Sequence, residues 1–198
     1  SSLVGLVGIS AAMMLNKGQG LPPMAVVPLC LGIGVAAGLW HGLLISKLDL
    51  QPFIVTLCSL FLFRGITRLI TGDQSQGFAG AYPGLRWFGN GFIGDTVAVP
   101  FVILVLLAIA IGAYLHFSPS GRHLFALGAN EEGARFSGIR TDRLKITAYV
   151  LCSLVTALGG LMLAFKVNSL GPSDFGSFFE LYAIAGAVLG GCSLRGGS

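Results

Sequence analysis

The stretch GRHLFALGANEEGARFSGIRTDRLKITAYVLCSLVTALGGL, residues 121–161, decides how the chain is organised, because charged side chains gather there as in no other long segment. Apolar runs of membrane length, 97–117 and 144–165, border its charged part on either side. Its charged residues are Arg122, Glu131, Glu132, Arg135, Arg140, Asp142, Arg143 and Lys145. The pattern indicates a water-facing connector, 118–143, between two membrane-spanning helices.

A short helix is predicted inside this connector. Asn130 is a good N-cap, Glu131 and Glu132 then lie at the positive end of the helix dipole, and Gly138 supplies the stop. Glu131 and Arg135 are spaced i,i+4 in the favourable order. A helix of two turns is too short to be stable alone in water. We therefore expect it to dock against another surface.

The composition indicates a membrane protein. Hydrophobic residues make up 54% of the chain and charged residues only 10%, and the mean hydropathy is +0.84. These values are too apolar for a soluble domain. The net charge of +4 does not indicate nucleic acid as a partner, because the basic residues are spread along loops without interleaved aromatic residues.

The apolar segments predict an all-α fold, a polytopic transmembrane helix bundle that forms one domain over 1–198. A span needs ~20 residues. We predict spans at 1–15 (partial), 24–46, 52–71, 97–117, 144–165 and 180–192 (short or broken). We expect the first to be part of a helix whose beginning is missing. The last has thirteen residues, and we expect it to run inward against segment 24–46 or its neighbour.

Segment 24–46 carries the motifs Gly34-x-x-x-Gly38 and Gly38-x-x-x-Gly42. Small residues at this spacing lie on one helix face and let another helix approach closely. We interpret them as a packing face rather than the lining of a pore.

The Gly-rich loop 72–96 carries Trp87 and Phe88. Aromatic residues just outside a span commonly lie among lipid headgroups. A surface for an external partner is an equally good interpretation at this point.

The positive-inside rule gives the orientation. One side of the membrane would receive seven basic residues: Lys47, Arg122, Arg135, Arg140, Arg143, Lys145 and Arg195. The other side would receive three: Lys17, Arg86 and Lys166. We therefore expect connector 118–143 to be cytoplasmic.

Three stretches resemble the permease subunits of ABC importers for ribose and similar monosaccharides. Those subunits carry a cytoplasmic loop close to GR-x-x-x-A-x-G-x-N-x-x-A-A-x-x-S-G-I. The matching residues are Gly121, Arg122, Ala126, Gly128, Asn130, Ala134, Ser137, Gly138 and Ile139. The stretches LQPFIVTLCSLFLFRGITRLITG (50–72) and FELYAIAGAVLGGCSLRGG (179–197) agree as well. Gly133 departs from the usual alanine of the importer coupling helix, which should loosen that helix by up to about 1 kcal/mol.

The resemblance implies a multi-pass subunit of the bacterial inner membrane that imports a monosaccharide or similar solute by alternating access. It implies three protein partners: a cytoplasmic ATP-binding subunit, a second permease subunit and a periplasmic sugar-binding protein. This chain itself would bind no cofactor, since ATP and magnesium belong to the ATP-binding subunit. Compared with the family, we expect the permease to be incomplete.

The resemblance also assigns candidate residues. Those that would couple transport to the ATP-binding subunit are Asn130, Glu131, Glu132, Gly133, Ala134, Arg135 and Gly138. The family-like stretches further offer polar groups beside small residues as substrate-path candidates. These are Gln51, Thr56, Arg64 and Glu180.

Catalytic motifs are missing from the sequence. It contains no G-x-x-x-x-G-K-[ST], H-E-x-x-H or G-x-S-x-G, and its cysteines form no C-x-x-C pair that would indicate a metal site. We do not expect an enzyme. There are two alternatives. One is a passive channel or secondary transporter, and the other is a structural membrane protein that packs through its glycine faces. Co-purification of an ATPase would separate the importer from both.

Overall fold

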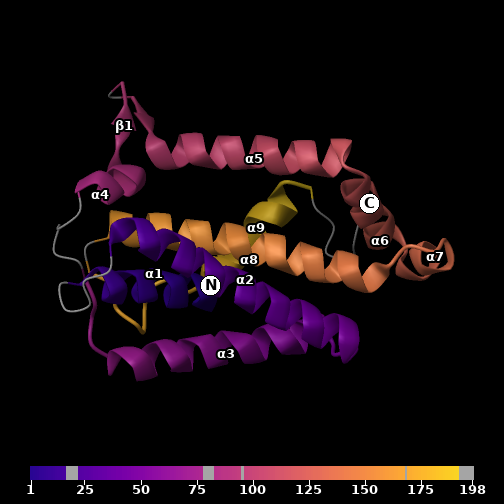
Figure 1. Ribbon diagram of the computed structural model, residues 1–198, viewed down its shortest axis with the longest axis horizontal. Helices are drawn as coiled ribbons and strands as arrows, with labels where there is room; N and C mark the ends of the chain where they lie inside the picture. The colour runs from indigo at the N-terminus through magenta and orange to yellow at the C-terminus, as the bar shows by residue number, and fades with distance from the viewer. Residues whose placement is uncertain (17–21, 78–82, 95, 168, 192–198) are drawn as a thin grey trace.

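The computed structural model describes residues 1–16, 22–77, 83–94, 96–167 and 169–191, and it confirms the all-α fold (Figure 1). The helices are α1 Ser2–Leu15, α2 Pro23–Lys47, α3 Pro52–Thr71, α4 Pro83–Asn90, α5 Val99–Phe117, α6 Pro119–Ala129, α7 Glu131–Phe136, α8 Thr141–Lys166 and α9 Phe179–Leu189. The strands β1 Phe92–Ile93 and β2 Val97–Ala98 pair as an antiparallel hairpin.

Four of the described helices, α2, α3, α5 and α8, are long and apolar enough to cross a membrane. They correspond to the four full spans predicted from the sequence. Helix α5 begins at Val99 rather than 97, because Val97 and Ala98 pair with β1. Helix α8 begins at Thr141 rather than 144, with Asp142 in its first turn, where a negative charge suits the helix dipole.

The core surrounds α1, which packs against α2, α3 and α8. Nearly every residue of α1 is buried, and Val7, Ala11 and Ala12 are completely inaccessible. Many large apolar side chains of α3 and α5 point outward instead, including Phe61 and Leu106. Such surfaces suit contact with lipid, where apolar side chains need no cover from protein.

The glycine motifs of α2 form the seam with α8, as predicted. A Cβ added to Gly34 would lie 2.6 Å from the Cβ of Ala157, and one added to Gly38 would lie 2.6 Å from the Cα of Val150. At Gly42 the nearest atom would be the Cα of Ile146 at 2.8 Å. The two backbones therefore approach so closely that only glycine fits at these positions of α2.

The structure corrects the description of two loops. Loop 72–96 contains α4 and the β1–β2 hairpin, and connector 118–143 contains α6 as well as the predicted short helix. Helix α6 starts with Pro119 in its first turn. The hydroxyl of Ser118 caps it by accepting a hydrogen bond from the Ser120 N–H at 3.1 Å.

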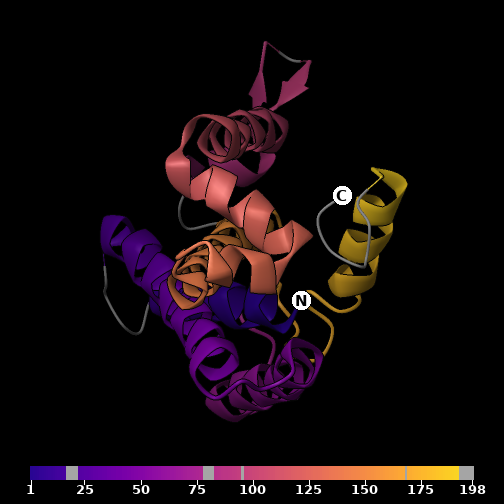
Figure 2. The same cartoon turned by 90° about the vertical axis from the view of Figure 1, so that its right-hand side faces the viewer.

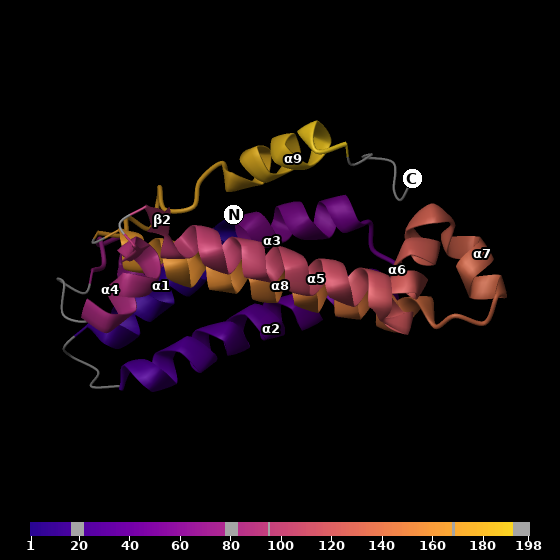
Figure 3. The ribbon, with the colours of Figure 1, turned by 90° about the horizontal axis from the view of Figure 1, so that it is seen from above.

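The predicted short helix at 180–192 is present as α9, but its predicted packing is wrong. None of its residues is buried, and Figures 2 and 3 show it standing apart from α2. Phe178, in the left-handed backbone region with φ of 63°, precedes the helix and turns the chain away from the bundle. Position 192 lies outside the described residues.

Candidate functional site

The predicted coupling residues lie at one end of the molecule, where α6 and α7 join α5 to α8 (Figures 1 and 3). Helix α6 folds back on the end of α5, and Gly121 makes this turn possible because a Cβ there would clash with the backbone of Leu115. The rings of His116 and Phe125 meet edge to face at 5.9 Å across the same corner.

Asn130 ends α6 and begins α7. Its backbone N–H donates to the carbonyl of Ala126 at 3.1 Å, which closes α6. Its side-chain Oδ1 accepts from the N–H of Gly133 at 2.9 Å, and its carbonyl accepts from the N–H of Ala134 at 3.0 Å. The prediction that Asn130 caps a helix is confirmed.

Gly138 ends α7 in a Schellman motif. The N–H of Gly138 donates to the carbonyl of Arg135 at 3.1 Å, and the N–H of Ile139 donates to the carbonyl of Ala134 at 3.2 Å. The φ of Gly138 is +78°, a region that costs other residues about 1–2 kcal/mol. The predicted stop is confirmed.

Helix α7 has only six residues, and contacts with α8 hold it in place. Glu131 forms an ion pair with Lys145 rather than with Arg135, the partner that its spacing favoured. Ala134 is buried, at 5% exposed. The neighbouring junction of α2 and α8 carries a second ion pair, between Lys47 and Asp142 at 3.3 Å.

The outer side of α7 faces away from the bundle. Glu132 and Arg135 are exposed, and Phe136 is 92% exposed, the largest apolar surface on this helix. Sequence reasoning missed Phe136, although an aromatic residue inside a charged connector was the available signal. Beside the helix lies a hollow of about 310 Å³, lined by Lys47, Arg135, Ile139, Arg140, Thr141, Asp142 and Arg143. This end is basic and also carries exposed aromatic side chains, of which Phe136 is the one on α7.

Two of the substrate-path candidates lie at the start of α3. Gln51 is exposed and precedes the helix, where its side chain makes no capping hydrogen bond. The hydroxyl of Thr56 donates to the carbonyls of Pro52 and Phe53, each at 3.0 Å. Thr56 is thus bound to its own helix.

Arg64 and Glu180 lie away from the start of α3. Arg64 is two turns beyond Thr56, and its Nη1 donates to the carbonyl of Ser173 and to the hydroxyl of Ser177, the latter at 2.9 Å. Glu180 lies in the first turn of α9. Eight helical residues place Thr56 roughly 12 Å from Arg64 along the axis. The structure therefore does not gather the four candidates into one site.

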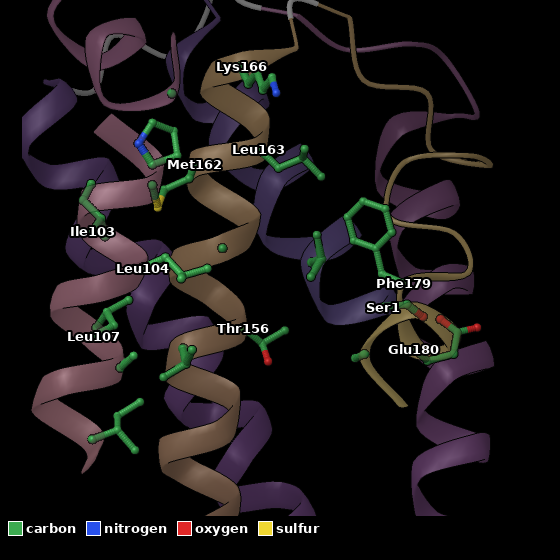
Figure 4. Close-up of a pocket in the computed structure, with 18 residues that line it drawn as sticks. Ser1, Ile103, Leu104, Leu107, Thr156, Met162, Leu163, Lys166, Phe179 and Glu180 are labelled. Carbon is green, nitrogen blue, oxygen red and sulfur yellow. The ribbon is translucent and has the colours of Figure 1, made fainter. Parts of the chain in front are cut away.

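A cavity of about 690 Å³ separates the middle of α5 from α8 and the start of α9 (Figure 4). Its walls are mainly aliphatic. Ile103, Leu104 and Leu107 of α5 line one side, and Met162 of α8 lines the other. Glu180 is the one path candidate that lines it. Sequence reasoning missed this cavity, because periodicity does not show that two spans stand apart.

Comparison with known proteins identifies the family. The family described as "Branched-chain amino acid transport system / permease component" matches residues 2–197. The chain belongs to this permease family. It is accordingly a multi-pass membrane protein of a family of transporter subunits, not of enzymes.

Curated relatives of this permease align along almost all of its length. The ribose import permease protein RbsC of Bacillus subtilis (strain 168) is 37% identical over 198 residues, which cover 99% of this chain and 61% of the relative. The galactofuranose transporter permease protein YtfT of Escherichia coli (strain K12) is 34% identical, over 99% of this chain and 56% of the relative.

The fructose import permease protein FruF of Bifidobacterium longum (strain NCC 2705) is 33% identical, over 99% of this chain and 55% of the relative. The chain thus spans about three fifths of the length of these curated relatives. No solved structure matches it.

Proposed function

We propose that this permease is the membrane-spanning subunit of an ATP-driven importer. It would carry a monosaccharide or a similar small polar solute into the cytoplasm by alternating access, within the bacterial inner membrane. ATP hydrolysis would take place in a separate cytoplasmic subunit, which holds the ATP and magnesium. A second permease subunit and a periplasmic sugar-binding protein would complete the assembly.

The observation that carries this proposal is the construction of α7. Six residues do not form a stable helix alone in water, yet Asn130 caps the start, Gly138 closes the end and Lys145 pairs with Glu131. These contacts hold a small rigid element at the end of the bundle, with Phe136 turned outward. A passive channel needs no such element, whereas an ATP-binding subunit needs a surface on which to act.

The relatives support the solute class. Their names specify ribose and fructose as imported sugars and galactofuranose as a transported one. For this permease the candidate contacts remain Gln51, Thr56, Arg64 and Glu180. Cysteine substitutions at true contact positions should be protected from thiol reagents by the transported sugar, and equal labelling with and without sugar would remove a position from the set.

Coupling can be tested with a matched pair of glycine variants. Gly138 and Gly72 both have positive φ, +78° and +58°, and a Cβ would meet nothing within 4 Å at either. Valine should therefore strain both sites similarly. Gly138 closes α7, whereas Gly72 caps α3 at the opposite end.

We expect Gly138→Val to abolish sugar uptake while ATP hydrolysis by the assembled importer continues, because the docking surface no longer holds its shape. Gly72→Val should retain uptake at comparable membrane levels. Unchanged uptake in Gly138→Val, or equal losses in both variants, would contradict the proposal.

A further inference from the structure

Helix α4 and the β1–β2 hairpin lie at the end of the molecule opposite α7 (Figure 1), and they carry exposed apolar side chains. We call these two elements the rim segment. Trp87 and Phe88 are 49% and 47% exposed, and their rings meet edge to face at 5.7 Å. Phe92 and Ile93 of β1 are 61% and 49% exposed. The proposed function leaves this surface without a role.

The rim segment is fixed at the depth where α8 ends. A Cβ added to Gly89 would lie 2.7 Å from the backbone nitrogen of Lys166, so α4 touches the last turn of α8 directly. The side-chain amide of Asn90 donates to the carbonyl of Lys166 at 3.3 Å. Leu85 packs against the core from the inner face of α4. Since α8 is a membrane-spanning helix, its end marks the edge of the bilayer.

The direction of the hairpin indicates that lipid, rather than water, surrounds it. In Figure 1 the spans α3, α5 and α8 run along the long axis of the molecule, and the hairpin extends across that axis. Figure 2 shows it pointing outward beyond α5, away from the bundle. A hairpin in this direction lies over the lipid that surrounds α5. A surface meant for a protein arriving from the water would project along the axis.

The apolar surface of the hairpin also continues directly onto lipid-facing surface. Strand β2 runs into α5, with Ala98 as the N-cap. The exposed Phe92 and Ile93 are followed along α5 by the exposed Phe101 and Leu106. An apolar surface that is continuous with a lipid-facing helix is well placed for the same lipid to cover it.

We propose that the rim segment binds the surface of the bilayer. Trp87 and Phe88 lie among the headgroups and upper acyl chains, and Phe92 and Ile93 insert their side chains beside α5. Aromatic rings are favoured at this depth because one part of the environment is apolar and the other is wet. The segment thereby fixes the depth and tilt of α5 and α8 in the membrane.

Tryptophan fluorescence tests the proposal directly. The chain has two tryptophans, Trp40 and Trp87, so Trp40→Phe leaves Trp87 as the single probe. The permease is reconstituted in phosphatidylcholine vesicles whose acyl chains carry bromine either near the headgroup or near the chain end. We expect quenching of Trp87 by the shallow bromine to be at least about twofold stronger than by the deep one. If aqueous iodide quenches Trp87 and neither brominated lipid does, the proposal is overturned. That result would favour a surface for a soluble protein.

A second variant tests the role of the hairpin. Phe92→Ser combined with Ile93→Ser, in the single-tryptophan background, should weaken the shallow quenching and shift the Trp87 emission to longer wavelength. Phe136→Ser changes an exposed apolar residue at the opposite end and should leave both signals unchanged. Equal effects of the two changes, or no effect of the hairpin change, would show that the hairpin does not hold Trp87 in the lipid.

Discussion

Arg64 is a charged side chain within the span α3, and such a charge is costly in the bilayer unless it finds partners. The structure supplies two, because Nη1 donates to the Ser173 carbonyl and to the Ser177 hydroxyl. Both acceptors belong to the segment between α8 and α9. Arg64 therefore ties that segment to α3. This contact gives it a structural role, which leaves its predicted role in the substrate path untested.

Removing Arg64 should destabilise the fold more than removing its neighbour. Hydrogen bonds from a charged donor contribute about 1.5–3 kcal/mol, so we expect Arg64→Ala to lower the free energy of unfolding in detergent by an amount in this range. Arg68 lies one turn further along and pairs with Asp73 at 3.7 Å on an exposed surface. Arg68→Ala should cost no more than about 1 kcal/mol. Equal unfolding midpoints for the two variants would contradict this account of Arg64.

At the scale of elements, the α2–α8 seam is the most extensive helix contact among the described residues, and one glycine comparison measures its contribution. A Cβ at Gly38 would lie 2.6 Å from the Cα of Val150, whereas one at Gly32 on the same helix would meet nothing within 4 Å. Overpacking of a tight contact costs about 1–3 kcal/mol.

We expect Gly38→Ala to lower the unfolding temperature of the permease in detergent. Gly32→Ala should leave it unchanged or raise it slightly, because alanine favours a helix over glycine. If both substitutions have the same effect, the seam is not held by close backbone contact.

The elements also show what could be predicted from the sequence. Segment 52–71 matches α3 at both ends, because Pro52 suits a first helical turn and Gly72 in the left-handed region ends the helix. The cap and stop of α7 followed from Asn130 and Gly138 for the same local reason. Helix α6 was missed, since its Gly-containing sequence was interpreted as a connector. The packing of α9 could not be predicted, because it depends on the backbone turn at Phe178 rather than on helix periodicity.

At the scale of the whole molecule, the two ends differ in chemistry. Lys47, Arg122, Arg135, Arg140, Arg143 and Lys145 lie around α6, α7 and the start of α8, at one end of the spans. The rim segment at the other end carries exposed aromatic residues and Arg86. This asymmetry agrees with the predicted cytoplasmic position of α7. The sequence predicted the division into ends, but not the cavity between α5 and α8, which depends on how distant segments pack.

The central claim is that α7 is the surface on which a cytoplasmic ATP-binding subunit acts, and thiol crosslinking tests it most directly. In a background with the four cysteines replaced by alanine, a single cysteine is placed at Phe136, and a second variant carries one at Phe92 at the opposite end. A short bifunctional thiol reagent is then applied to membranes that contain the assembled importer. The account predicts that Phe136→Cys forms a crosslinked product with the ATP-binding subunit and that Phe92→Cys does not. A crosslink from Phe92→Cys, or none from Phe136→Cys while uptake is intact, would contradict it.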